Sequence, residues 1–271
     1  MAVTIMYLMT LLYILALCLS MGSTISLRYI SIAVFGLGAL ANVLICFFKY
    51  YHSWPLMPMY QTPVFVTAFI GLLVLGEIRK KAFRVRLLMF TVAVISLAVT
   101  LFPKDFYLPF LKSRTVFSHI FMLSGALGQA FFMAGGVEAA CSIHNSGRVP
   151  FLNTKGVSET SSETKFPGWD SSYIVWGFIF WTISMFSGEL WSYLGWGNPV
   201  VWDDATIVMS MATWFYYVAL LHLYLLKPWD ARKRAYAAVA GLLLVFVFNV
   251  LPNLGSFRIP NMKNLLVLLG A

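Results

Sequence analysis

Charged residues are scarce in this chain of 271 residues. They make up 11% of it, hydrophobic residues make up 60%, and the mean hydropathy is +0.81. A typical soluble domain has about a quarter of its residues charged, so this composition excludes a water-soluble globular domain. The sequence contains instead a series of long apolar runs, which predicts an integral membrane protein.

Cysteine is also rare. Cys18, Cys46 and Cys141 all fall in apolar runs, and the sequence has no CxxC pair and no metal-ligand spacing around them. A disulfide framework or a structural zinc site needs paired or regularly spaced thiols. We therefore interpret the three cysteines as packing residues.

The apolar runs have the length of membrane helices. Crossing a hydrocarbon core of about 30 Å takes about 20 apolar residues per helix. Strict alternation of apolar and polar residues, which barrel strands require, is missing. The predicted fold class is all-α, a polytopic membrane helix bundle of about eight transmembrane helices, near residues 2–20, 27–50, 59–78, 87–103, 117–142, 173–192, 205–226 and 235–251.

Basic residues exceed acidic ones, which gives a net charge of +9. If the N-terminus lies outside, thirteen of the nineteen basic residues fall on the cytoplasmic side. Cytoplasmic connections of membrane proteins are enriched in Lys and Arg. The distribution therefore predicts both termini on the non-cytoplasmic side of a bacterial-type inner membrane, and it predicts no nucleic-acid partner.

One segment has the composition of a long loop. Residues 143–172 are polar and rich in Ser, Thr, Gly and Pro, and they fall on the predicted cytoplasmic side. Nothing in them has catalytic spacing, so we interpret them as a connector. The other connections are short, which predicts a single transmembrane domain over residues 1–271.

Small residues repeat along the fifth apolar run. Ala126, Ala130 and Ala134 recur every four residues, with Ser124 and Gly128 beside them. This spacing allows two helix backbones to approach closely in lipid. Helix packing is the simpler interpretation, and space for a flat ligand is the alternative.

A tryptophan-rich segment, residues 188–204, follows the sixth run on the predicted external side. Trp191, Trp196 and Trp202 lie within twelve residues and precede Asp203. An aromatic belt at the membrane interface accounts for any one of these tryptophans. Three of them, interrupted by glycines, are more typical of a surface on which a large planar hydrophobic ligand stacks, and haem is such a ligand.

Histidine is the usual axial donor to haem iron. His119 begins the fifth run on the same external side as the tryptophans, and His52 lies in the first external connection. His222 lies about 30 Å of helix beyond Trp202, so these two cannot serve one haem. The sequence permits an external site at His119 and a separate inner site at His222, although a hydrogen bond from His222 to a neighbouring helix is an alternative. For His144 we expect solvent exposure.

A family resemblance is carried by residues 188–225, which read GELWSYLGWGNPVVWDDATIVMSMATWFYYVALLHLYL. This stretch resembles the tryptophan-rich motif of the CcsA-type cytochrome c biogenesis proteins, in the superfamily of CcmC and CcmF. The family pattern runs approximately G-x-x-W-x-x-x-x-W-G-x-x-x-x-W-D-P-K-E-T-W, followed by T-W and L-H. The matching residues are Gly188, Trp191, Trp196, Gly197, Trp202 and Asp203, and, after one extra residue, Thr213, Trp214, Leu221 and His222.

Two further segments support the resemblance, and three places depart from it, one of them Asp204, Ala205 and Thr206, where the family has P-K-E after the Trp-Asp pair. The segment SHIFMLSGALGQAFFMAGGVEAA is similar to the family helix that begins with an external histidine, here His119, and FKYYHSWPLMPMYQTPVFVTAFI is similar to an external turn of the family. The last external segment of the family supplies a second external histidine in a G-L-H-S-Y-like context, where this chain reads NLGSF at 253–257. Asn42 replaces a histidine that many members carry in the second helix. His52 is our hypothesis for the replacement external ligand.

The resemblance implies a function in cytochrome c maturation of the system II type. Haem b would be presented externally to the CxxCH motif of an apocytochrome c, with a CcsB-like membrane protein as partner, as in a cytochrome c haem lyase. The alternative is a non-catalytic, CcsA-like structural or electron-transfer subunit of a larger respiratory or multihaem complex. The implied haem-binding residues are His119 and His222 as axial ligands to the iron, together with His52, Trp191, Trp196, Trp202 and Asp203.

Overall fold

The computed structural model describes residues 2–22, 24–54, 62–78, 82–104, 115–146, 170–200, 202, 204–226 and 229–257. These residues form helices and turns, and no strand occurs among them. The α-helices are α1 (Ala2–Ser20), α2 (Ile25–Ser53), α3 (Thr62–Gly76), α4 (Ala82–Leu101), α5 (Val116–Ser146), α6 (Ser172–Trp196), α7 (Ala205–His222) and α8 (Ala231–Val245). Three short helical segments follow α7 and α8, namely η2 (Leu223–Leu225), the π-helical η3 (Phe246–Val250) and η4 (Leu251–Asn253).

The predicted all-α membrane bundle is confirmed. The helices α2, α4, α5 and α6 and the run from Ala231 to Asn253 are long and apolar enough to cross a membrane. The apolar helices at Thr4–Ser20, Thr62–Gly76 and Ile207–His222 are shorter. The chain is therefore a membrane protein with several apolar helices, and the side of the membrane on which its termini lie stays a prediction.

Two helix ends differ from the sequence prediction. The helix α5 continues to Ser146, so the first residues of the predicted loop are helical. The helix α6 continues to Trp196 and stops at Gly197, which has a φ of 77° and donates its N–H to the Tyr193 carbonyl at 2.9 Å. Glycine adopts this left-handed conformation without steric cost. As a result, Trp196 as well as Trp191 lies on the last turns of a helix.

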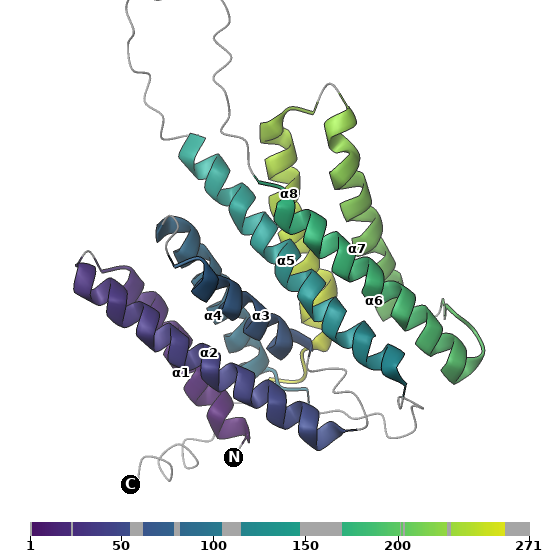
Figure 1. Ribbon diagram of the computed structural model, residues 1–271, viewed down its shortest axis with the longest axis horizontal. Helices are drawn as coiled ribbons and strands as arrows, with labels where there is room; N and C mark the ends of the chain where they lie inside the picture. Colours follow the sequence, from purple (N-terminus) through teal and green to yellow (C-terminus); the bar gives the residue numbers. More distant parts are fainter. Residues whose placement is uncertain are drawn as a thin grey trace, which may run out of the picture.

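The helix α5 runs through the middle of the bundle, between α1–α4 on one side and α6–α8 on the other (Figure 1). Its most extensive interface is with α6, and it also packs against α8, α3 and α4. Because consecutive helices run in opposite directions, α2, α4 and α6 end at the same end of the bundle where α5 and α7 begin (Figure 1). We call this end, with residues 50–54, 102–104, 115–121, 191–200, 202, 204 and 251–257, the tryptophan end.

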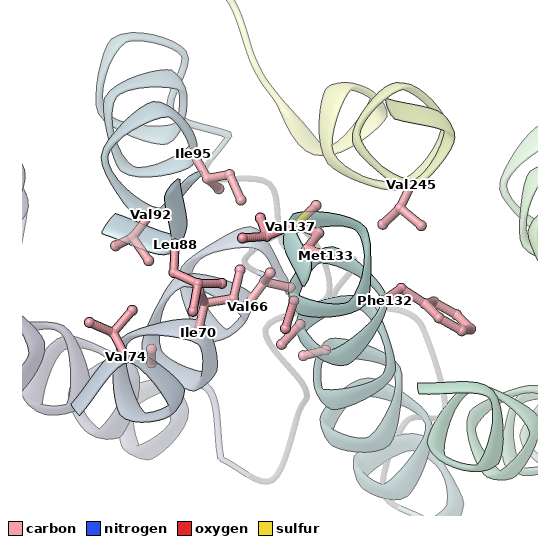
Figure 2. Close-up of a cluster of buried hydrophobic side chains, with 14 of the residues drawn as sticks. Val66, Ile70, Val74, Leu88, Val92, Ile95, Phe132, Met133, Val137 and Val245 are labelled. Atoms are coloured by element: carbon pink, nitrogen blue, oxygen red, sulfur yellow. The ribbon is translucent and has the colours of Figure 1, made fainter. Parts of the chain in front are cut away.

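Both faces of α5 are buried. On one face, Val66 and Ile70 of α3 and Leu88 of α4 fill the space beside α5 (Figure 2). On the other face, the Phe132 ring lies parallel to the Tyr217 ring of α7, with 3.5 Å between ring centroids. The aliphatic and aromatic packing around α5 therefore joins the two halves of the bundle.

The small residues of α5 serve helix packing. Ala126, Ala130 and Ala134 are buried. A Cβ added at Gly128 would lie 2.9 Å from the backbone nitrogen of Trp181 and 3.1 Å from the Gly177 carbonyl oxygen, both on α6. No side chain fits between the two backbones at this point. The packing interpretation is confirmed.

The opposite end of the bundle contains a buried ionic cluster. The Arg84 guanidinium of α4 contacts the Glu77 carboxylate through Nε and Nη2, at 2.8 Å each, and the Glu138 carboxylate of α5 through Nη1 at 2.7 Å. The Tyr173 hydroxyl of α6 also donates to Glu77. Ionisable groups within a membrane bundle need such partners. The cluster links α4, α5, α6 and the residue that follows α3.

The close approach at Gly128 makes a quantitative prediction. We expect Gly128→Val to lower the free energy of unfolding by about 1–3 kcal/mol, because overpacking a tight interface forces the helices apart. Gly76→Val is the matched control, since a Cβ at Gly76 has no atom within 4 Å. Chemical denaturation in detergent measures both variants. Equal stability of the two variants would contradict the close approach of α5 and α6.

Candidate functional site

His119 lies in the first turn of α5, at the tryptophan end. Its Nδ1 is 2.7 Å from the Tyr50 hydroxyl oxygen. The Trp54 ring stacks on the imidazole, with 5.1 Å between centroids and 22° between planes. Both aromatic residues come from the end of α2, one helical turn apart. The ring of His119 is therefore held between an aromatic face and a hydroxyl group.

Trp191 packs between α5 and α6. It is only 6% exposed, and its ring stacks on Phe121 of α5 at a centroid distance of 6.0 Å. A Cβ at Gly188 would lie 2.8 Å from the Phe121 ring. Gly188 and Trp191 of the motif thus pack against Phe121, a side chain of the helix that carries His119.

The sequence-predicted external residues occupy one end of the bundle but different faces of α5. Residues two apart on a helix differ by about 200° in direction, so His119 faces α2 while Phe121 faces Trp191. Trp202 lies in the turn between α6 and α7 and is 68% exposed. Asp203 and the side chain of Trp196 lie outside the described residues. The described residues bring His119 together with Tyr50 and Trp54 and do not place its ring against Trp191.

His52 lies on a different face of α2 from the residues that contact His119. Tyr50 and Trp54 are four residues apart and so share one face, and His52 lies between them, about 200° around the helix from each. Its side chain is exposed, and its ring is 6.5 Å from that of Tyr51. The structure does not bring His52 and His119 together.

His222 is the last residue of α7, and its side chain is exposed. Its Nδ1 is 2.7 Å from the Val218 carbonyl oxygen. A carbonyl can only accept, so Nδ1 carries the proton and the lone pair of Nε2 is available to a ligand. Among the described residues the ring is bonded within its own helix, and the alternative of a hydrogen bond to a neighbouring helix is not found.

His144 differs from the sequence prediction. It is half-buried, not exposed, and its ring stacks on Phe83 of α4 with 4.2 Å between centroids. The reason is the longer α5, which continues to Ser146 and keeps this histidine on a packed helix.

Other residues of the motif hold helices together. The Trp214 indole N–H donates to the Thr182 hydroxyl at 3.0 Å, which joins α7 to α6. Thr213 accepts a hydrogen bond from the Asn249 amide of η3 at 3.0 Å. The T-W pair of the motif therefore positions α7 between α6 and η3.

Comparison with known proteins identifies the family of the chain. Residues 6–254 match the cytochrome C assembly protein family. The chain belongs to this family. Similar curated proteins, each called cytochrome c biogenesis protein CcsA, come from Prochlorococcus marinus strain MIT 9312, with 35% identity over 71 residues, and from Synechococcus strain CC9902, with 30% over 121 residues. A third, from Gloeothece citriformis strain PCC 7424, is 31% identical over 113 residues.

The matched parts are short relative to the cytochrome c assembly proteins concerned. They cover 26%, 45% and 39% of this chain and 23%, 38% and 34% of the three relatives, respectively. The chain thus matches less than two fifths of the length of each of these relatives. The comparison establishes the family, and the structure explains two positions at which this member departs from the family pattern.

Asn42, where many family members carry a histidine, is fully buried between α1, α2 and α3. Its amide lies 2.8 Å from the Thr67 hydroxyl and 3.2 Å from the Tyr13 hydroxyl. With its oxygen facing these groups, it also accepts from the Ala68 N–H, and its nitrogen donates to the Val64 carbonyl. Both ends of the amide are satisfied by protein groups, so Asn42 links helices.

Gly255 lies in NLGSF, the segment where the resemblance led us to expect a second external histidine. Its N–H donates to the Phe102 carbonyl at 2.9 Å, and Lys104 Nζ donates to the Pro252 carbonyl at 2.9 Å. A Cβ at Gly255 would overlap the backbone carbonyl of Pro103, whose carbon is 2.9 Å away. Residues 252–255 are therefore hydrogen-bonded to the residues that follow α4, and no space is left for a side chain at Gly255.

We expect Gly255→His to destabilise the protein instead of restoring an axial ligand, because the new side chain would push the backbone of 252–257 away from α4. The loss should be about 1–3 kcal/mol and is measured by denaturation in detergent. Ser256→His is the matched control, since Ser256 is exposed. A Gly255→His protein as stable as the control would contradict the backbone contact seen here.

Proposed function

We propose that this protein handles haem during cytochrome c maturation, holding haem b at its tryptophan end for attachment to an apocytochrome c. The observation that carries the proposal is the combination of the tryptophan-rich motif with a histidine in the first turn of α5 at the same end of the bundle. Membership of the cytochrome c assembly family and the names of the relatives support it. The cytoplasmic membrane of a bacterial-type cell is the proposed location.

In the proposed outer site, His119 would hold the haem iron. Its Nδ1 contacts Tyr50, so Nε2 is the nitrogen available to a metal. Because His119 is in the first turn, a flat group lying over the start of α5 would reach the turn that contains Trp202. In this proposal Trp191, Trp196, Trp202 and Asp203 line that surface, with Trp191 supporting it from below through Phe121.

Haem would supply the iron and the vinyl groups to which the two thiols of a CxxCH motif add. The chain itself would hold the porphyrin flat, exclude water from one face with indole rings, and leave the external edge open to the client. Attachment of this kind is the activity of a cytochrome c haem lyase, and this chain would be a component of one.

In the proposed inner site, His222 would hold haem iron together with a donor from a second chain. The Nε2 lone pair is directed away from its own helix, and the side chain is exposed. Exposed polar groups on a membrane helix are costly unless a partner covers them. We propose that a CcsB-like membrane protein, or a subunit of a respiratory complex, covers this face of α7 and supplies the second ligand.

A reduced-minus-oxidised spectrum of the purified protein tests whether haem b is bound. We expect His119→Ala to lose the outer haem signal and to fail in complementing a cytochrome c maturation mutant, whereas His144→Ala, which removes a histidine packed on Phe83, keeps both. A wild-type protein without haem would exclude the proposed function. Stable haem-containing complexes without complementation would support the alternative, a structural or electron-transfer subunit.

His52 stays the predicted replacement for the second external ligand. Because the structure does not bring His52 and His119 together, His52 would bind the same iron only after its side chain moves on haem binding. His52→Ala is the second variant of the same experiment, and the expected result is a change from a bis-histidine to a single-histidine spectrum. A bis-histidine spectrum that is unchanged by His52→Ala excludes this residue.

The exposed ring of Trp202 provides a separate prediction. We expect Trp202→Ala to weaken haem retention about tenfold, since an aromatic contact of this kind is worth about 0.5–1.5 kcal/mol beyond its buried area. Trp229→Ala is the control, because Trp229 precedes α8 at the opposite end of the bundle and is also exposed. Haem release to a scavenging apoprotein measures retention. Equal release from both variants would show that Trp202 serves only as an interfacial residue.

A further inference from the structure

We infer that Tyr50 and Trp54 are positioning residues for His119, which fix the orientation of its ring and provide an acceptor for its Nδ1 proton when Nε2 binds a metal. The inference rests on the proposed function, in which His119 ligates iron. Neither residue belongs to the tryptophan-rich motif, and both come from the last turns of α2. Residues of α2 therefore orient the ligand that α5 carries.

The hydrogen bond with Tyr50 can serve the metal-binding tautomer. A neutral imidazole has one N–H, so a ring that offers Nε2 to a metal must carry its proton on Nδ1. The Tyr50 hydroxyl, 2.7 Å from Nδ1, can donate to Nδ1 or accept from it, and in the metal-binding tautomer its oxygen accepts. An acceptor at this position orients the ring and increases the basicity of the ligating nitrogen. Tyr50 therefore provides the outer partner that a metal-bound His119 needs.

The stacked indole constrains the ring orientation. With 5.1 Å between centroids and 22° between planes, Trp54 covers one face of the imidazole, so rotation of that ring would break the stacking contact. The Tyr50 ring is close to both, 5.5 Å from His119 and 6.1 Å from Trp54. The His119 ring has Trp54 on its face and Tyr50 at its edge, so it is restricted to few orientations. Ligand binding therefore costs little further side-chain entropy.

The two positioning residues are themselves fixed by the end of α2. The Tyr50 carbonyl accepts hydrogen bonds from the Trp54 N–H and from the Ser53 hydroxyl, each at 3.1 Å. These bonds close the last helical turn and keep the two aromatic rings on one face. The arrangement is thus a property of the helix end.

A structural role alone would have a different experimental signature. If Tyr50 only packed α2 against α5, removal of its hydroxyl would change stability and leave the properties of the bound haem alone. A positioning role changes the haem itself, because loss of the acceptor makes the imidazole a weaker donor. The reduction potential and the retention of haem distinguish the two cases.

The experiment uses the full chain, purified with haem in detergent, and compares Tyr50→Phe, Trp54→Phe and His119→Ala with the wild type. We expect Tyr50→Phe to reduce haem retention about tenfold, the lower end of the usual effect of an outer partner, and to shift the reduction potential to more positive values. Tyr29→Phe is the control, because Tyr29 is an exposed tyrosine near the other end of α2. Thermal unfolding is recorded for every variant.

Each outcome is decisive. A Tyr50→Phe protein that matches Tyr29→Phe in retention and potential, while His119→Ala loses the outer haem, overturns the inference and leaves the proposed function intact. An unchanged spectrum in His119→Ala overturns the proposed outer site and the inference with it. If Tyr50→Phe is unstable, we measure the reduction potential of the haem that stays bound to Tyr50→Phe and to Trp54→Phe. A potential unchanged from the wild type in both variants overturns the inference.

Discussion

The contact of α5 with α6 at Gly128 is the constraint on which the rest of the bundle depends. Because no side chain separates the two backbones there, α5 and α6 are in close backbone contact. This contact fixes the register between the two helices. That register places Phe121 over Gly188 and against Trp191. It also sets where the first turn of α5, with His119, stands relative to the turn that follows α6.

The tryptophan-rich motif consists of two kinds of residue. Gly188, Trp191 and Trp214 face neighbouring helices and hold the scaffold, whereas Trp202 is exposed at the end of the bundle. The spacing of the motif thus encodes a helix interface as well as a surface. Retention of the motif spacing in this chain is therefore compatible with a structural requirement as well as with ligand binding.

The sequence predicted the helices well because apolar runs of about 20 residues are limited by the bilayer and not by particular neighbours. It ended α6 too early, since the left-handed cap at Gly197 is one glycine among several in that segment. It also missed the contact of Tyr50 and Trp54 with His119, which joins residues 69 positions apart. Periodicity within one helix carries no information about which helix lies opposite. The spacing of Tyr50 and Trp54, four residues apart before a predicted external turn, was the one sequence signal for this contact.

His222 has a consequence for assembly. In the proposed inner site, this histidine, with its Nδ1 proton directed to the Val218 carbonyl, would offer half of a coordination site on the outside of the bundle. If a second subunit contributes the other half, cofactor affinity and subunit affinity are thermodynamically reciprocal, so that each raises the other by the same factor. The amount of complex in the membrane would then follow the supply of porphyrin, and an unloaded chain would be released as a monomer.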